Sequence, residues 1–433
     1  MTRCPSCQAK LPQRTPSWCP RCGEPLSPGR YRWDLGERLA PWEDRGPTAS
    51  PSDPLLAFPA RENRGRWGAW IATLLAAAVL VLALAVLGRL GAGGVEPGAS
   101  PGAALFPAYD PATNRYGYID PTGSFVIQPQ FEEALPFAED RAPVASAGRW
   151  GFVDREGRLV VPMLYDQVSP FSEGLALVQL KDEQGYIDRD GARILWPAPP
   201  GAQPFSEGLA AVLAEGGPAG TWGYIDRSGE LVIAPLSSSP GGFSEGLAPV
   251  RVPLEDGRVK SGYVDRSGTL VIPAKFAAAL PFAEGVAAVW TDGDPLHYWG
   301  YVDPSGTYAI APQFWEASSF SEGLAVVKVG SQSSHLGYGY IDHSGAFVIE
   351  PRFWGAEPFS EGLAAVQPLA GAGDYRWGYV DRKGRLTIPA QFAEAGPFSP
   401  GGLALVSLDQ EGRERAYIDR SGAVVYSWVE PPS

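Results

Sequence analysis

The chain has 433 residues, a formal net charge of −13, 53 Gly, 43 Pro and only 4 Cys. The acidic balance argues against a general nucleic-acid binder, and four cysteines in this length exclude a scaffold stapled by disulfides. Glycine and proline exceed a fifth of the residues, which predicts frequent turns and few long helices. Charge is unevenly distributed, because residues 1–66 hold 11 basic against 7 acidic residues while residues 90–433 hold 23 against 41.

The N-terminal segment contains all of the cysteine, as two C-x2-C pairs separated by eleven residues. Two such pairs offer four thiolates to one tetrahedral metal, and the metal would supply most of the folding free energy of so short a segment. The segment resembles bacterial zinc ribbons, in which the C-P-x-C-G knuckle at Cys19–Gly23 is typical. We expect a zinc ribbon over residues 1–26 with one structural Zn²⁺; iron in a rubredoxin-like site and redox-active dithiols are the alternatives. The expected zinc ligands are Cys4, Cys7, Cys19 and Cys22.

A linker over residues 27–66, which we expect to be disordered, precedes an uncharged run at residues 67–88. Twenty-two helical residues would extend about 33 Å, enough for a bilayer core of about 30 Å, so we expect a transmembrane helix over residues 67–90. A buried helix and a signal peptide are the alternatives. Three arginines within residues 61–66 precede the run and only Arg89 follows it, which places the N-terminus in the cytoplasm and the C-terminal region outside.

After a second linker at residues 91–104, one pattern recurs nine times. A G-[YF]-[IV]-D box ends at nine aspartates, with Ala416 in place of glycine in the last copy. From each aspartate but the last, the phenylalanine of an F-[SA]-E-G-[LV]-A-x-V box follows 17 residues later, whereas the distance from that second box to the next aspartate varies. Fixed spacing indicates packed geometry, and variable spacing indicates an exposed loop. The box aspartates are Asp120, Asp154, Asp188, Asp226, Asp265, Asp303, Asp342, Asp381 and Asp419.

These boxes resemble the WG (KWG) repeat family of bacterial proteins, and residues 222–235 followed by residues 243–250 come close to its consensus. The resemblance covers about residues 109–426 and implies family membership without implying one activity.

The residues themselves predict three antiparallel strands in each unit: G-L-A-x-V, W-G-Y-I-D, and L-V-I-x-P, whose proline ends or edges the ladder. An Asp-x-x-Gly turn joins the last two. Residues 105–109 can supply the strand missing from the first unit. We therefore expect an all-β tandem-repeat domain over residues 105–428. One unit cannot bury both faces, so units must stack. The expected stack is a propeller with G-L-A-x-V at the axis; an open β-solenoid is the alternative.

The recurrent carboxylates invite a catalytic interpretation, which we reject. Each aspartate fits a turn cap, and each box glutamate fits a cap or a hydrogen bond within its E-G turn, whereas catalysis needs dissimilar groups brought to one place. The three histidines fit no metal spacing and are expected in solvent, the box tryptophans are expected to be packing residues, and no hydrolase motif occurs. We therefore predict that the protein is not an enzyme.

The predicted function is a membrane-anchored binding or scaffold protein that presents its repeats to a protein or an envelope glycan outside the cytoplasm. A transmembrane signalling protein whose zinc ribbon contacts a cytoplasmic partner is the alternative. Recognition is expected in the longer connections 213–221, 251–261, 290–298, 328–337 and 367–376. The candidate ligand-binding residues there are Asp292, Asp294, His297, His335, Tyr375 and Arg376.

Overall fold

The computed structural model describes residues 104–213, 220–291, 298–331, 334–369 and 375–430. The expected zinc ribbon, both N-terminal linkers and the transmembrane helix over residues 67–90 lie outside these ranges, apart from Ala104. In the described part, no helix is long and apolar enough to cross a membrane. The described elements are antiparallel strands in eight sheets, as the sequence predicted for this region. The seven-stranded sheet contains two repeat units, because one long strand, β26, pairs with both β25 and β27.

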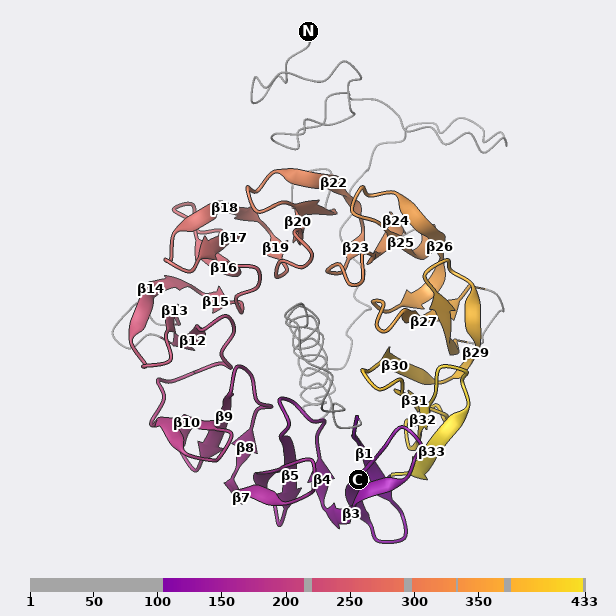
Figure 1. Cartoon of the computed structure of the whole chain (residues 1–433). Coiled ribbons are helices and arrows are strands. Elements are labelled where there is room, and N and C mark those ends of the chain that lie inside the picture. The colour runs from indigo at the N-terminus through magenta and orange to yellow at the C-terminus, as the bar shows by residue number, and fades with distance from the viewer. Residues whose placement is uncertain (1–103, 214–219, 292–297, 332–333, 370–374, 431–433) are drawn as a thin grey trace, which may run out of the picture. The chain divides into compact units, whose positions relative to one another are not determined.

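All nine units have three strands, which we call second, third and outer strand, and most have an inner strand before them. Figure 1 shows the units following one another around a ring. The second strands carry the G-L-A-x-V segment or its equivalent: β1 (Phe106–Asp110), β5 (Ala142–Ser146), β9 (Leu175–Leu180), β12 (Ala210–Leu213), β16 (Leu247–Pro253), β20 (Ala287–Trp290), β24 (Ala325–Ser331), β27 (Leu363–Pro368) and β31 (Ala404–Ser407). The third strands carry the W-G-Y-I-D segment: β2 (Arg115–Ile119), β6 (Arg149–Val153), β10 (Glu183–Asp188), β13 (Trp222–Ile225), β17 (Val259–Asp265), β21 (Trp299–Val302), β25 (Ser334–Ile341), β28 (Trp377–Asp381) and β32 (Glu414–Ile418).

The outer strands carry the L-V-I-x-P segment or its equivalent: β3 (Phe125–Phe131), β7 (Leu159–Tyr165), β11 (Arg193–Leu195), β14 (Leu231–Ser237), β18 (Leu270–Phe276), β22 (Tyr308–Phe314), β26 (Phe347–Ala356), β29 (Leu386–Phe392) and β33 (Val424–Val429). Most outer strands continue through their proline, for example β3 through Pro129. The prediction that proline edges the ladder is confirmed, and the prediction that it ends the strand is wrong. An edge strand tolerates proline because its outward N–H needs no partner in the sheet.

Short inner strands are the main departure from the predicted three-stranded unit. They precede the second strand in six units: β4 (Glu133–Ala134), β8 (Gln167–Val168), β15 (Ser239–Pro240), β19 (Ala278–Ala279), β23 (Glu316–Ala317) and β30 (Glu394–Phe398). The end of β26 takes the same position in the eighth unit. In these seven units, the chain that leaves the preceding outer strand therefore pairs with the second strand, on the side opposite the third strand. The sequence predicted that the G-L-A-x-V strand would be the innermost strand of each unit. In the units with an inner strand, this prediction is wrong.

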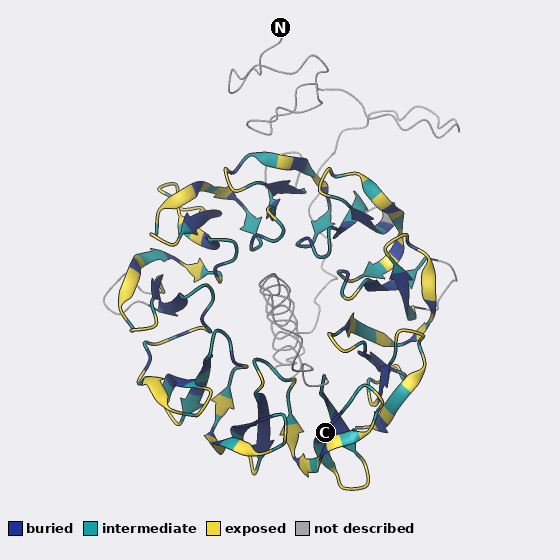
Figure 2. Ribbon diagram, viewed as in Figure 1, coloured by how far each residue is buried: buried dark blue, intermediate teal, exposed yellow. Residues whose placement is uncertain are grey.

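The hydrophobic core lies between consecutive units. One cluster joins Tyr263, Ile272 and Phe276 of the fifth unit to Phe282 and Val289 of the sixth. Figure 2 shows buried residues concentrated in the second and third strands and exposed residues along the outer strands. Packing between neighbours, rather than within one sheet, is what a unit with a single apolar face requires.

The first described unit contacts the last one. The rings of Phe106 and Tyr417 lie 5.4 Å apart, and the Tyr417 hydroxyl donates a hydrogen bond to the Pro107 carbonyl at 3.0 Å. The Tyr426 hydroxyl donates to the Tyr109 carbonyl, also at 3.0 Å. In seven other units, the box tyrosine donates to a carbonyl 17 residues later, in the next unit. These pairs are Tyr118–Leu135, Tyr186–Gln203, Tyr224–Gly241, Tyr263–Leu280, Tyr301–Ser318, Tyr340–Glu357 and Tyr379–Gly396.

Candidate functional site

The side chains of the box aspartates accept hydrogen bonds from the turns in which they lie. In the fifth unit, Asp265 Oδ1 accepts hydrogen bonds from the amides of Ser267 and Thr269 at 2.9 and 3.0 Å and from the Ser267 hydroxyl at 2.6 Å. The Ser267 hydroxyl bond lowers the pKa of Asp265 below its ordinary value. The predicted turn cap is therefore confirmed, and this carboxylate already has its partners.

The box glutamates hold neighbouring units together, which corrects the expected hydrogen bond within the E-G turn. Glu207 Oε2 accepts the amide of Gly246, 39 residues later in the next unit, at 2.9 Å, and Arg266 of that unit donates to the Glu207 carbonyl at 2.6 Å. Glu207 itself has φ of 51°, a left-handed conformation that costs free energy outside glycine. Six such Glu–Gly contacts occur: Glu139–Gly174, Glu173–Gly208, Glu207–Gly246, Glu245–Gly285, Glu284–Gly323 and Glu322–Gly362.

His343 belongs to this same set of contacts and is not a purely solvated loop residue. It follows a box aspartate, where Arg227, Arg266 and Arg382 stand in other units. Its Nε2 lies 3.4 Å from Glu284 Oε2, and its ring stacks on Phe320 at 4.1 Å between centroids. Its side chain remains partly exposed.

Two faces of the repeat region follow from the strand directions. The E-G turns and the Asp-x-x-Gly turns lie at one end of the strands, which we call the turn face. The hairpins between second and third strands lie at the other end, which we call the loop face. These hairpins differ in length, as the pairs Ser146–Arg149, Pro253–Val259 and Leu213–Trp222 show, and their variability matches the variable spacing in the sequence.

The predicted ligand-binding residues are only partly within the described structure. Asp292, Asp294 and His297 lie outside it, and for His335 only the backbone position in β25, opposite Gly330, is described. Tyr375 is 60% exposed, and its ring lies 6.3 Å from that of Trp354 in an edge arrangement. Arg376 donates a hydrogen bond to the Gln391 carbonyl at 2.8 Å.

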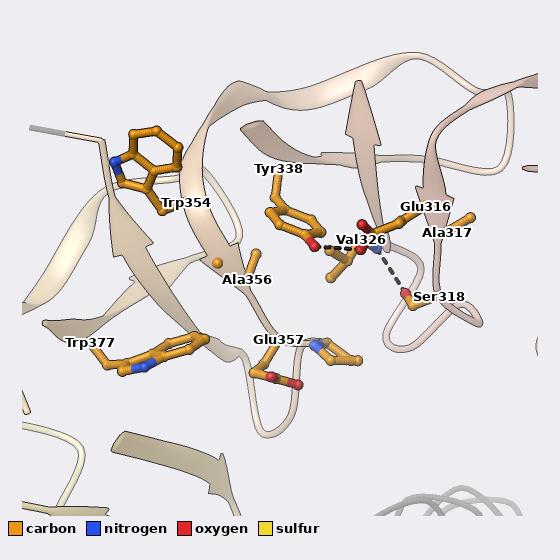
Figure 3. Close-up of a pocket in the computed structure, with 11 residues that line it drawn as sticks. Glu316, Ala317, Ser318, Val326, Tyr338, Trp354, Ala356, Glu357 and Trp377 are labelled. Carbon is orange, nitrogen blue, oxygen red and sulfur yellow. Dashed lines mark hydrogen bonds between the residues drawn. The ribbon is translucent and has the colours of Figure 1, made fainter. Parts of the chain in front are cut away.

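A cavity of about 460 Å³ opens between the seventh and eighth units. Figure 3 shows Tyr338 and Glu316 on one side of it and Trp354, Trp377 and Glu357 on the other. The volume lies in the range of small-ligand sites.

One half of the cavity is internally neutralised. Lys328 Nζ lies 2.9 Å from Glu316 Oε1, and the Tyr338 hydroxyl donates a hydrogen bond to Glu316 Oε2. Lys328 Nζ also lies over the Tyr338 ring, 4.9 Å from its centroid. An ammonium group, an aromatic face and a carboxylate therefore meet at one point.

The other half is lined by Trp354, Trp377 and Glu357. Trp354 is 39% exposed at the end of β26, and Trp377 begins β28. Gly355 lies against Trp377, because a Cβ at this position would be 3.0 Å from Trp377 Cη2. Partial desolvation raises the pKa of Glu357 above its ordinary value, although the side chain keeps exposed surface.

Sequence analysis missed Trp354 and Glu357 because they lie at a strand end and not in a long hairpin. The copies nevertheless contain a signal. Glu357 stands two residues before a box phenylalanine, where the other copies have uncharged residues. Those residues are Leu135, Ser169, Gln203, Gly241, Leu280, Ser318 and Gly396. Within the described ranges, no group of three or more histidine, cysteine, aspartate or glutamate residues could hold a metal ion.

The stacked meanders define the class of this protein as an all-β repeat protein. The family model described as "WG containing repeat" matches residues 116–148, 150–183, 222–252, 262–293, 299–332, 338–367 and 377–411, more than half of the chain. The chain belongs to the WG repeat family. The two boxes outside the matched ranges, which end at Asp188 and Asp419, are those with the most divergent outer strands.

Solved structures show similarity in fold. The crystal structure of a eukaryotic initiation factor is 13% identical over 76% of this chain and 96% of that chain, with a TM-score of 0.54. An uncharacterized protein from Listeria monocytogenes is 12% identical over 69% of this chain and 94% of that chain, with a TM-score of 0.34, too low to support an argument. The chain matches no curated protein.

Proposed function

We propose that the chain is a membrane-anchored, non-enzymatic binding protein that presents its loop face to a protein or an envelope glycan outside the cytoplasm. One observation carries the proposal. The recurrent Asp and Glu side chains are used in turn caps and in contacts between units, while length variation occurs at the loop face. A rigid frame with variable loops is a typical arrangement for recognition.

We further infer that the nine units form a closed, propeller-like ring. The support is the contact between the first and last units, where Phe106 packs on Tyr417 as each later box phenylalanine packs on the tyrosine or phenylalanine of the preceding unit. Gly123 of the first unit approaches Val425 of the last, as Gly306 approaches Ile272 of its predecessor. Closure leaves no terminal unit with an uncovered apolar face.

Shortening the long loops tests the binding proposal. We expect a variant whose connections 251–261, 290–298 and 367–376 are cut to the length of Ser146–Arg149 to fold normally. We also expect it to lose the partner that photo-crosslinking of the intact chain captures in cells, because the contacting surface is gone. Matched control substitutions on the outer strands, Leu231→Thr and Leu270→Thr, should leave capture unchanged. Equal capture by the trimmed variant would contradict the proposal.

The N-terminal part of the proposal comprises a cytoplasmic zinc ribbon at residues 1–26 and a membrane span at residues 67–90. It rests on the four-cysteine spacing and on the flanking arginines. A variant with all four cysteines changed to serine tests both. We expect it to lose one bound Zn²⁺ per chain, and it provides a cysteine-free background for topology mapping. In that background, a single cysteine at Ser50 should be shielded from an impermeant thiol reagent in intact cells, and one at Ser267 should be labelled. Unchanged zinc content would refute the four-cysteine zinc site. Labelling at position 50 with shielding at position 267 would refute the proposed topology.

A further inference from the structure

One position on the turn face, directly after each box aspartate, provides cationic contacts between neighbouring units. It is arginine in six units, proline in two, and histidine, His343, in the seventh. Five of the arginines donate a hydrogen bond to the box glutamate of the preceding unit: Arg189–Glu139, Arg227–Glu173, Arg266–Glu207, Arg382–Glu322 and Arg420–Glu361. His343 contacts Glu284, the box glutamate of the unit before its own. An imidazole therefore stands between the sixth and seventh units where a guanidinium joins five other pairs of units.

The imidazole of His343 touches both groups that hold its junction together. Its Nε2 lies 3.4 Å from Glu284 Oε2, and the same oxygen accepts the Gly323 amide of the seventh unit at 2.9 Å. On its other side, the ring stacks on Phe320, with 4.1 Å between centroids and 20° between planes. Phe320 is buried and belongs to the core cluster that the two units share. A change in the charge of His343 is therefore felt by the contact between the units.

The described charged groups that interact with His343 are both carboxylates. Glu284 comes from the E-G turn of the sixth unit, and Asp342 precedes His343 in its own turn. The Ser344 hydroxyl bond and, more weakly, the charge of His343 lower the pKa of Asp342. Carboxylates ordinarily stay ionised above about pH 5 and a guanidinium stays charged throughout, whereas an imidazole changes its charge between about pH 5 and 8.

We infer that His343 makes the junction between the sixth and seventh units a pH-sensitive clamp, tighter when the imidazole is protonated than when it is neutral. The protonated ring is attracted by Glu284, by Asp342 and by the face of the Phe320 ring, whereas the neutral ring loses these charge interactions. The extra stabilisation is therefore present near pH 5 and is lost as the pH rises towards 8. The inference goes beyond the proposed function and does not depend on it, because it concerns the turn face and no ligand.

Hydrogen exchange of the full chain at pH 5.5 and pH 8 tests the inference. The readout is the protection factor of the Gly323 amide, which corrects for the intrinsic dependence of exchange on pH. We expect it to be about two- to fivefold lower at pH 8, the range for a partly exposed ion pair. The Gly362 amide is the internal reference, because it donates to Glu322 at a junction where Arg382 takes the place of the histidine. Its protection factor should be the same at both pH values.

Three substitutions assign the effect to the imidazole. His343→Arg should keep the higher protection factor at both pH values, and His343→Gln, which cannot be protonated, should give the lower one at both. Arg382→His should transfer the pH dependence to the Gly362 amide. The inference would be overturned by a protection factor at Gly323 that does not change with pH in the parent chain, by a decrease that persists in His343→Arg, or by an unchanged Gly362 in Arg382→His.

Discussion

Replacing Phe106 by alanine is expected to destabilise the whole repeat region by about 3–5 kcal/mol, the usual cost of removing a buried phenylalanine from a core. Phe106 is 6% exposed and belongs to the cluster that joins the first unit to the last, with Tyr417 and Trp428. In a closed ring this cluster covers two units that would otherwise be ends. Urea unfolding monitored by tryptophan fluorescence measures the change in the free energy of unfolding.

The matched control is Phe243→Ala, because Phe243 packs on Tyr224 at an interior junction in the way that Phe106 packs on Tyr417. A closed ring predicts comparable losses for both substitutions, with faster amide hydrogen exchange in units far from either site. An open solenoid predicts that Phe106→Ala only frays its two terminal units, since each unit there depends on its neighbours alone. Unchanged protection of the fifth unit in Phe106→Ala would contradict closure.

The sequence predicted the parts of the fold that repeat at fixed spacing. The second, third and outer strands and the Asp265-type turn caps followed from residues that recur at constant distances, and the hairpins followed from the one distance that varies. The inner strands could not be predicted, because two residues such as Glu133–Ala134 have no periodicity of their own. Their pairing depends on the position at which the outer strand of the preceding unit ends.

The partners of the box glutamates were equally inaccessible to sequence reasoning. The acceptor Glu207 and the donor Gly246 are 39 residues apart, and only the stacking of two units brings them together. The cavity illustrates the same limit. Tyr375 was chosen from a long hairpin, but Trp354 and Glu357 reach the cavity from a strand end. The departure of Glu357 from the other copies was visible, whereas its place beside Trp377 in the cavity lining was not.

The glycine of the W-G-Y-I-D box is expected to be irreplaceable where the outer strand bulges, and Gly262→Ala tests this. A Cβ at Gly262 would lie 2.5 Å from the Ile272 carbonyl oxygen and 2.8 Å from the Ala274 amide nitrogen, both backbone atoms that cannot move independently. The cause is the register, in which Ser261 and Tyr263 pair with Phe276 and Ile272, so that four residues of one strand oppose two of the other.

We expect Gly262→Ala to cost at least about 3 kcal/mol, because either the bulge flattens and withdraws Phe276 from the core or the strands separate. The chain supplies its own control in Ala416, the alanine at this box position in the last unit. Ala416 pairs with Ser427 and Tyr417 pairs with Tyr426 without a bulge between them. Ala416→Gly should therefore cost only about 1 kcal/mol, the usual penalty for glycine in a strand.

The contrast between the two substitutions assigns the requirement for glycine to the bulge and not to the third strand in general. Ile272 and Phe276 are both buried, and they pair with Tyr263 and Ser261 on the two sides of the bulge. The last unit has no bulge at this position, and its outer strand has Tyr426 and Trp428 there instead. Thermal unfolding of both variants provides the measurement. If Gly262→Ala proves as stable as the parent chain, the close approach of the outer strand cannot be the reason that glycine recurs in this box.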